Sequence, residues 1–214
     1  VGGGIIGVEV ASEIATKYPN TNITIVHSKS RLIERNPSNA SKNAKNFLEN
    51  NNVNIILNEK VVENKNNTFI TSKKRKINVD MTIWCAGTKC DSSFLNRFKG
   101  SIFSKKNCLK VDKYLRLNGY NNIFVGGDIT NIDEEKTAQN SERHAKVISK
   151  NIKNILKNKK LRKYKKFRGP LFISLGSKKG ISVFGNFSYF GYLPIFAKNF
   201  IEYWFFHTIG LRSG

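Results

Sequence analysis

The stretch that decides the fold is the first seven residues, Val1-Gly2-Gly3-Gly4-Ile5-Ile6-Gly7. Gly2, Gly4 and Gly7 have the spacing G-x-G-x-x-G. In this motif the first glycine makes a tight turn, the second lets the backbone approach a pyrophosphate, and the third lets a helix pack on a strand. The motif therefore predicts a phosphate-binding turn at the start of a helix, as in NAD(P)H sites. A glycine-rich helix entry without a ligand is the alternative.

The residues that follow have the pattern of a β–α–β unit. Apolar spacing predicts a helix from about Ile6 to Tyr18 and a buried strand over Ile23 to His27. The same reasoning predicts a helix over Ser38 to Asn50 and a third strand over Val53 to Leu57. The sequence thus indicates an α/β fold whose first strand is cut short, so the chain is expected to be a fragment that begins inside its own motif.

The end of the second strand is where a dinucleotide-binding fold reads the adenosine ribose. A carboxylate at this place would accept a hydrogen bond from the 2′-hydroxyl of NADH. Here the position falls on His27, followed by Ser28, Lys29 and Arg31. Because these groups can bind a 2′-phosphate, NADPH is expected to be accepted or preferred; alternatively, His27 is only a strand-end residue.

Glu9 follows the last glycine of the motif in Gly7-Val8-Glu9. We expect it in the first helical turn, close to a bound cofactor. The alternative is that its charge only stabilises the helix dipole.

The middle of the chain changes its period. Three short alternating segments predict a three-stranded meander: 59–63, 68–72 and 75–79. A buried strand is expected over Met81 to Cys85, running into Ala86-Gly87-Thr88.

A second glycine turn precedes a long helix. Short strands are expected over 109–111, 114–117 and 123–125, the last ending in Gly126-Gly127-Asp128. The carboxylate of Asp128 suits a polyol, although it could equally cap a turn. Lys136, Thr137 and Ala138 open a helix predicted to run to Leu156, whose first amides suit an electron-rich ring edge.

Composition limits the classes of function. The chain of 214 residues has 37 Lys and Arg against 15 Asp and Glu, a net charge of +22. Its densest basic run, Lys150 to Arg168, is expected to be a linker and could contact nucleic acid or a membrane surface, although a solvated surface is the simpler interpretation. No apolar run of 18 residues exists, so a membrane-spanning helix is not expected. Three cysteines favour a reducing compartment, and neither a redox disulfide pair nor a metal site is expected.

The last part of the chain, Pro170 to Leu211, is rich in glycine and phenylalanine. It is expected to form a small antiparallel sheet followed by an aromatic helix. That helix could pack over the rest of the protein or lie at a membrane interface.

In order along the chain, these motifs resemble those of the FAD-dependent pyridine nucleotide-disulfide oxidoreductases. They are most similar to the apoptosis-inducing-factor-like, ferroptosis-suppressor NAD(P)H:quinone reductases. The residues that carry the likeness are Gly7-Val8-Glu9, Ile25 to Ser28, Ala86-Gly87-Thr88, Gly127-Asp128 and Lys136-Thr137-Ala138.

The resemblance implies a fold, two cofactors and a set of roles. It implies an NAD(P)H domain over 1–105 inserted in a partial FAD domain over 106–165, with a carboxyl-terminal α+β segment over 166–214. Glu9 would lie near the nicotinamide and the flavin, Ala86-Gly87-Thr88 would close over the NAD(P)H domain, and Asp128 would bind the FAD ribitol. Lys136, Thr137 and Ala138 would face the flavin pyrimidine, which makes Glu9 and Lys136 the expected catalytic residues.

The activity implied is hydride transfer from NAD(P)H to FAD and electron transfer to a quinone or another small acceptor. The family's first glycine motif, which binds the FAD pyrophosphate, is absent, so the chain alone is expected to be inactive. The resemblance also implies an intracellular location, cytoplasmic or mitochondrial, with possible peripheral membrane contact. Two rivals remain: a basic protein that binds nucleic acid or an apoptosis-related partner, and a reductase of a protein electron carrier.

Overall fold

The computed structural model describes residues 1–65, 67–87, 90–95, 102–104, 106–166 and 169–210. By its internal contacts the chain divides into two compact units, which are described separately. Unit 1 comprises Val1–Gly87 and Gly169–Gly214, and unit 2 comprises Thr88–Arg168. The division into domains at 105/106 and 165/166 stays a prediction.

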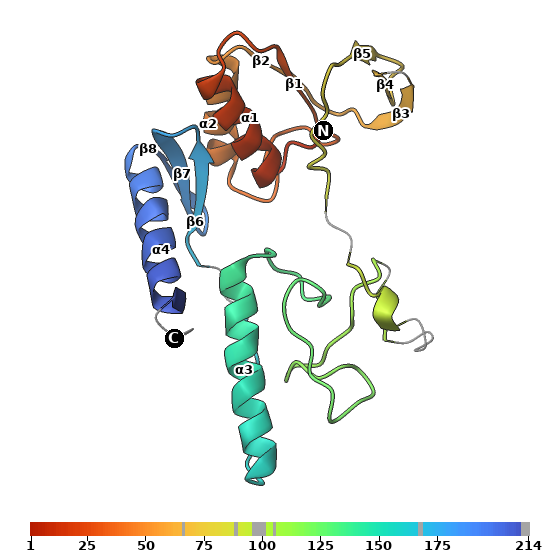
Figure 1. The fold of residues 1–214 in the computed structure, drawn as a ribbon, viewed down its shortest axis with the longest axis vertical. Helices are drawn as coiled ribbons and strands as arrows, with labels where there is room; N and C mark the ends of the chain where they lie inside the picture. Colours follow the sequence, from red (N-terminus) through yellow and green to blue (C-terminus); the bar gives the residue numbers. More distant parts are fainter. Residues whose placement is uncertain (66, 88–89, 96–101, 105, 167–168, 211–214) are drawn as a thin grey trace. The chain divides into compact units, whose positions relative to one another are not determined.

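Unit 1 is an α/β structure in layers (Figure 1). The strands β1 (Ile23–Val26) and β2 (Val53–Ile56) pair in parallel. Helices α1 (Ile5–Lys17) and α2 (Ser38–Glu49) pack against this pair. The predicted helices and strands of the β–α–β unit are confirmed to within one or two residues.

Small side chains let α1 and α2 approach each other and the strands. Ala11 and Ala15 of α1 and Ala40 and Ala44 of α2 are buried in one cluster. The same cluster includes side chains of the carboxyl-terminal sheet, among them Ile173 and Ile181. The two helices therefore lie between the parallel strands and that second sheet.

The carboxyl-terminal sheet is antiparallel, as predicted. Its order is β6 (Leu171–Leu175), β7 (Lys179–Phe184) and β8 (Phe187–Gly191), and helix α4 (Leu193–Gly210) packs on it. Many apolar side chains of α4 are exposed, including Phe196, Phe200, Tyr203 and Trp204. No helix in the described part of the chain is long and apolar enough to span a bilayer.

The predicted meander is also present. It consists of β3 (Val61–Lys65), β4 (Thr68–Thr71) and β5 (Lys76–Asn78), paired antiparallel in sequence order. Glu59 lies buried beside it and accepts hydrogen bonds from Thr71 and Arg75. These bonds hold the pKa of Glu59 below its ordinary value.

The expected buried strand over Met81 to Cys85 was wrong. The segment is extended coil, and Met81 and Trp84 are 80% and 59% exposed. Its backbone hydrogen bonds to Val1, whose amino group donates to Ile83 O and whose carbonyl accepts from Cys85 N. Among the described residues no strand pairs with this segment.

Unit 2 contains one long helix, α3 (Ala138–Leu156), which begins where predicted with Thr137 as its N-cap. The short strands expected over 109–111, 114–117 and 123–125 are absent as strands. They appear as isolated bridges, such as Val111 to Leu117 and Arg116 to Phe124. An apolar cavity of about 280 Å³ lies beside them, lined by residues from Phe94 to Ile129.

Two further expectations fail in unit 2. Cys90 and Cys108 form a disulfide, whereas the cysteine count favours a reducing compartment. The basic run is also not a free linker, because Asn151 of α3 binds the backbone of Arg162 through two hydrogen bonds. Long-range pairing of this kind leaves no local signal in the sequence.

Candidate cofactor sites

The glycine turn of unit 1 has the geometry of a phosphate cradle. Gly2 has φ +105°, and a Cβ at this position would lie 2.7 Å from the Cys85 carbonyl group. A Cβ on Gly7 would overlap the carbonyl oxygen of Gly2, so α1 packs directly on the turn. A Cβ on Gly4 would meet no atom within 4 Å. The three glycines thus serve the turn, the open approach and the close packing that the motif predicts.

Gly4 is also the N-cap of α1 and offers no side chain to the first helical amides. These amides have no partner within a helix, and together with the helix dipole they favour an anion. The open space above Gly4 therefore fits a pyrophosphate.

His27 lies under the turn rather than at its rim. It is buried; its Nδ1 accepts a hydrogen bond of 3.1 Å from Gly3 N, and its Nε2 lies 3.2 Å from Oε2 of Glu34. Because Nδ1 is an acceptor, the proton is on Nε2 and is directed to Glu34. Both ring nitrogens are thus used within the protein, and a contact with NADPH stays a prediction.

The other residues at the strand end differ in whether their side chains are already hydrogen-bonded within the protein. The Arg31 guanidinium donates to the carbonyl oxygens of Asn36 and Glu34, at 2.8 and 2.5 Å. Ser28 and Lys29 are exposed. These two side chains are the ones most available to a 2′-phosphate.

Ala86 and Gly87 lie at the same end of unit 1 as the turn. Both are exposed, and a Cβ on Gly2 would lie 2.9 Å from Ala86 N. Gly87 has φ +91°, with open space where its Cβ would be. Thr88, predicted with them, lies outside the described residues.

Glu9 is not in the first turn of α1, because the helix begins at Ile5. Its Oε1 accepts hydrogen bonds from Ser174 N of β6 at 2.9 Å and from Lys198 Nζ of α4 at 2.8 Å. Lys198 also donates to Ser174 Oγ at 2.7 Å. We call Glu9, Ser174 and Lys198 the Glu9 cluster; it joins α1, β6 and α4.

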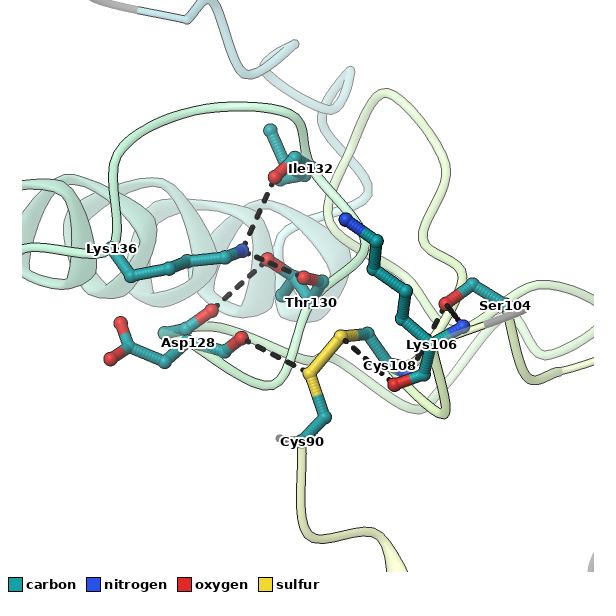
Figure 2. The surroundings of a disulfide bond; sticks show 9 residues. Cys90, Ser104, Lys106, Cys108, Asp128, Thr130, Ile132 and Lys136 are labelled. Carbon is teal, nitrogen blue, oxygen red and sulfur yellow. Dashed lines mark hydrogen bonds between the residues drawn. A yellow bond between two sulfur atoms is a disulfide. The ribbon is translucent and has the colours of Figure 1, made fainter. Parts of the chain in front are cut away.

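In unit 2 the second glycine turn packs on α3. A Cβ on Gly126 would lie 2.9 Å from Ile148 Cδ1, and Gly127 has φ +80°. Gly127 N donates to His144 Nδ1 at 3.0 Å. The turn brings Asp128 to the surface, where its carboxylate is exposed and points away from the disulfide (Figure 2).

The disulfide lies beside this turn, where Sγ of Cys90 is 3.7 Å from the carbonyl oxygen of Asp128. Lys136 approaches the same loop: its Nζ donates to the carbonyl oxygens of Thr130 at 2.8 Å and Ile132 at 3.2 Å (Figure 2). Burial lowers the pKa of Lys136, against the opposing effect of Asp128 and nearby carboxylates.

The start of α3 is half capped. Thr137 Oγ1 accepts from Asn140 N at 3.3 Å, while Ala138 is exposed. Gly127, Asp128, Lys136, Thr137 and Ala138 thus lie in one unit around one loop and one helix start. Their contacts with FAD stay predictions.

A buried polar group behind this turn was not predicted as a site. His144 Nε2 lies 2.7 Å from Oε1 of Glu134, and the same carboxylate accepts from Tyr164 OH at 2.8 Å. Burial and the hydrogen bond to Glu134 raise the pKa of Tyr164. These residues lie far apart in sequence, so no local motif marks them; the same holds for Ser174 and Lys198. In the part of the chain that the structure describes, no cluster of residues could hold a metal ion.

A glycine turn at a helix start beside parallel strands, with a second Gly-Asp turn against a long helix, defines an α/β dinucleotide-binding oxidoreductase fold. The chain belongs to the pyridine nucleotide-disulphide oxidoreductase family, whose model matches residues 1–145. Members of this family use FAD and NAD(P)H. The predicted family and the predicted α/β class are confirmed.

Relatives and solved structures agree with this assignment. Ferroptosis suppressor protein 1 of Taeniopygia guttata is 36% identical over 192 residues, which cover 85% of this chain and 51% of the relative. Apoptosis-inducing factor homolog B of Dictyostelium discoideum is 32% identical over 209 residues, covering 85% and 54%. The chain therefore spans about half the length of these curated relatives.

Two solved structures show the same fold at low identity. NDH2 from Plasmodium falciparum matches with a TM-score of 0.76 and 17% identity, covering 89% of this chain and 58% of that one. The sulfide:quinone oxidoreductase of Aquifex aeolicus has a TM-score of 0.79 and 14% identity, with coverage of 96% and 54%.

Proposed function

We propose that this chain is the NAD(P)H-binding part, and the carboxyl half of the FAD-binding part, of a flavin-dependent NAD(P)H oxidoreductase that reduces a quinone. The observation that carries the proposal is the turn from Gly2 to Gly7, which is closed by tight packing at both ends and open only above Gly4. The similarity to ferroptosis suppressor protein 1 and to a sulfide:quinone oxidoreductase supports the quinone acceptor.

In unit 1, the chain's own residues bind and orient the nicotinamide nucleotide. The first amides of α1 would hold the pyrophosphate above Gly4, and Lys29 with Ser28 would meet a 2′-phosphate. Ala86 and Gly87 would border the nucleotide on the side of Gly2. Glu9 would face the nicotinamide, with its carboxylate fixed by Ser174 and Lys198.

In unit 2, Asp128 would bind the ribitol hydroxyls through its exposed carboxylate. Lys136 and the first amides of α3 would meet the pyrimidine edge and stabilise negative charge there. When bound, FAD supplies the redox chemistry by accepting a hydride equivalent from NAD(P)H and passing electrons to the acceptor. The intracellular and peripheral-membrane location predicted from the sequence belongs to this proposal.

The nucleotide site is tested on the 214-residue chain by titration calorimetry with NADPH and NADH. Gly4→Ala places a methyl group in the open space, so both affinities should fall at least ten-fold while the melting temperature changes little. Lys29→Ala is the matched control, since it should weaken NADPH several-fold and leave NADH unchanged. Unaltered NADPH binding in Gly4→Ala would overturn the assignment of the turn.

The acceptor is tested on the complete gene product. We expect the purified protein to be yellow. NADPH should bleach the flavin absorbance, and a short-chain ubiquinone should restore it. Reoxidation by a ferredoxin-type carrier but not by the quinone would support the reductase of a protein carrier instead. A colourless complete product would defeat the flavoenzyme proposal.

A further inference from the structure

The proposed activity leaves the most charged surface of unit 2 without a role. Between residues 150 and 166 the chain has nine basic residues and no acidic one, and all nine are exposed. We call them the basic surface: Lys150, Lys153, Lys157, Lys159, Lys160, Arg162, Lys163, Lys165 and Lys166. Within the described residues none of them forms an ion pair.

The helical part of the basic surface forms one stripe. Lys150 and Lys153 of α3 and its C-cap Lys157 continue the face of Lys146, at intervals of four, three and four residues. The opposite face is the buried one, with His144 and Asn151 at its centre. The stripe therefore faces solvent along the last three turns of the helix.

The part after the helix is held in place and extends the stripe. Asn151 Oδ1 accepts from Arg162 N at 2.7 Å, and its Nδ2 donates to Arg162 O at 2.9 Å. Asn154 Nδ2 donates to Lys160 O at 2.7 Å, and Tyr164 N donates to Lys113 O. The basic side chains after α3 thus start from a backbone fixed against the helix, which reduces the entropy lost on binding.

One exposed apolar side chain borders the lysine stripe. Leu156 is 79% exposed, and Ile152 and Ile155 are 45% and 44% exposed. Leu156 lies beside Lys153 and Lys157 at the end of α3, whereas Ile152 and Ile155 are turned toward the face of His144 and Asn151. A surface that mixes lysines with exposed aliphatic side chains is typical of contact with a lipid interface.

The aromatic content of the same segment argues against single-stranded nucleic acid. Such ligands stack on free aromatic rings. Tyr164 is the one aromatic residue between 150 and 166, and its ring packs at 4.6 Å against His144 while its hydroxyl binds Glu134. A polyanion without lipid would pair with the lysines but gain nothing from Leu156.

We propose that the basic surface docks on an anionic lipid bilayer, with the lysines against headgroup phosphates and Leu156 at the acyl boundary. Each basic residue near such a surface strengthens binding about five-fold, and salt weakens the attraction by screening. The contact does not involve the glycine turn. Its test is therefore independent of the proposed cofactor chemistry.

The test is vesicle sedimentation of the 214-residue chain with phosphatidylcholine alone and with phosphatidylcholine containing about a third phosphatidylserine. Binding is expected only to the anionic vesicles and should fall as salt is raised from 50 to ~300 mM. The triple variant Lys153→Glu, Lys157→Glu, Lys160→Glu should bind about a hundred-fold more weakly. Leu156→Ser, which keeps every charge, should weaken binding about five-fold.

The matched control reverses three exposed lysines of unit 1, Lys42→Glu, Lys60→Glu and Lys76→Glu, and so changes the net charge equally. It should retain most of the binding. An equal loss in this control would show that net charge acts rather than the basic surface, and would overturn the proposal. Equal binding to neutral vesicles, or displacement from anionic vesicles by duplex DNA at equal phosphate, would overturn it as well.

Discussion

The Glu9 cluster gives the most direct test of how unit 1 is held together. Changing Lys198→Met removes the ammonium group and keeps most of the side-chain stem. The carboxylate of Glu9 then keeps only its hydrogen bond from Ser174 N, and Ser174 Oγ loses its donor. Since α1, β6 and α4 meet at this cluster, the free energy of unfolding should fall.

The magnitude follows from distance and exposure. The Lys198–Glu9 pair is 2.8 Å long, and its side chains are 25% and 24% exposed. A hydrogen bond to a charged group contributes about 1.5–3 kcal/mol when buried, and partial exposure reduces this to about 1–2 kcal/mol. In a protein of this size that corresponds to a fall in melting temperature of about 3–6 °C.

The assay is a double-mutant cycle by urea unfolding with Lys198→Met, Glu9→Gln and the double variant. We expect a coupling energy of about 1 kcal/mol, because the two groups contact each other directly. Lys45→Met is the matched control, since Lys45 pairs with Glu49 at 3.5 Å with both side chains about half exposed. That change should cost less than about 0.5 kcal/mol. A coupling below ~0.3 kcal/mol, or equal losses in Lys198→Met and Lys45→Met, would refute the reasoning.

Four further changes test other parts of the structure. Gly7→Ala should destabilise unit 1 by about 3 kcal/mol or more in urea unfolding, because its Cβ would overlap Gly2 O. Glu59→Gln should reduce the fall in the free energy of unfolding that occurs below pH 4.5. The lowered pKa of Glu59 stabilises the fold above that pH, and this contribution is lost as the pH falls through the folded-state pKa. Treatment with dithiothreitol should lower the stability of unit 2 by up to ~3 kcal/mol, because the bond from Cys108 to Cys90 closes a loop with a sequence separation of 18, and Cys108→Ser should no longer respond to it. Asn151→Leu should raise protease cleavage after Lys159 and Lys160, since the backbone of Arg162 loses two hydrogen bonds; an unchanged cleavage pattern would contradict this.

Local periodicity was sufficient to predict the helices and strands that bury one face. The boundaries of α1, α2 and α3 follow from apolar spacing and from a turn or cap at each end, and the meander β3 to β5 follows from short alternating runs. The segment from Met81 to Cys85 has an equally apolar pattern, but its backbone hydrogen bonds to Val1 and no described strand pairs with it. A strand needs a neighbour, and a local pattern cannot say whether one is present.

The contacts of the candidate sites were less accessible to sequence reasoning. The glycine spacing located the turn, and the position after β1 located Ser28 and Lys29. The partners of Glu9 are 165 and 189 positions away, so nothing near Glu9 could indicate them. The disulfide joins cysteines whose spacing matches no motif. The backbone of the basic run is held by hydrogen bonds with Asn151, which lies within helix α3 and belongs to no recognisable motif.

Both glycine turns are held by the same arrangement, which lies outside the glycine motif itself. In unit 1 the amide of Gly3 donates to Nδ1 of His27, and in unit 2 the amide of Gly127 donates to Nδ1 of His144. In each case the other ring nitrogen faces a glutamate, Glu34 or Glu134.

This repeated arrangement separates two roles: supporting the backbone of the glycine turn, and contacting a bound phosphate. A buried imidazole that accepts from a turn amide fixes the backbone from below, and an unsatisfied amide there would cost about 1–3 kcal/mol. The same imidazole cannot also present a free nitrogen to a phosphate above the turn. In unit 1 the support therefore comes from His27, and the exposed Ser28 and Lys29 that follow remain the residues that we propose discriminate between NADPH and NADH.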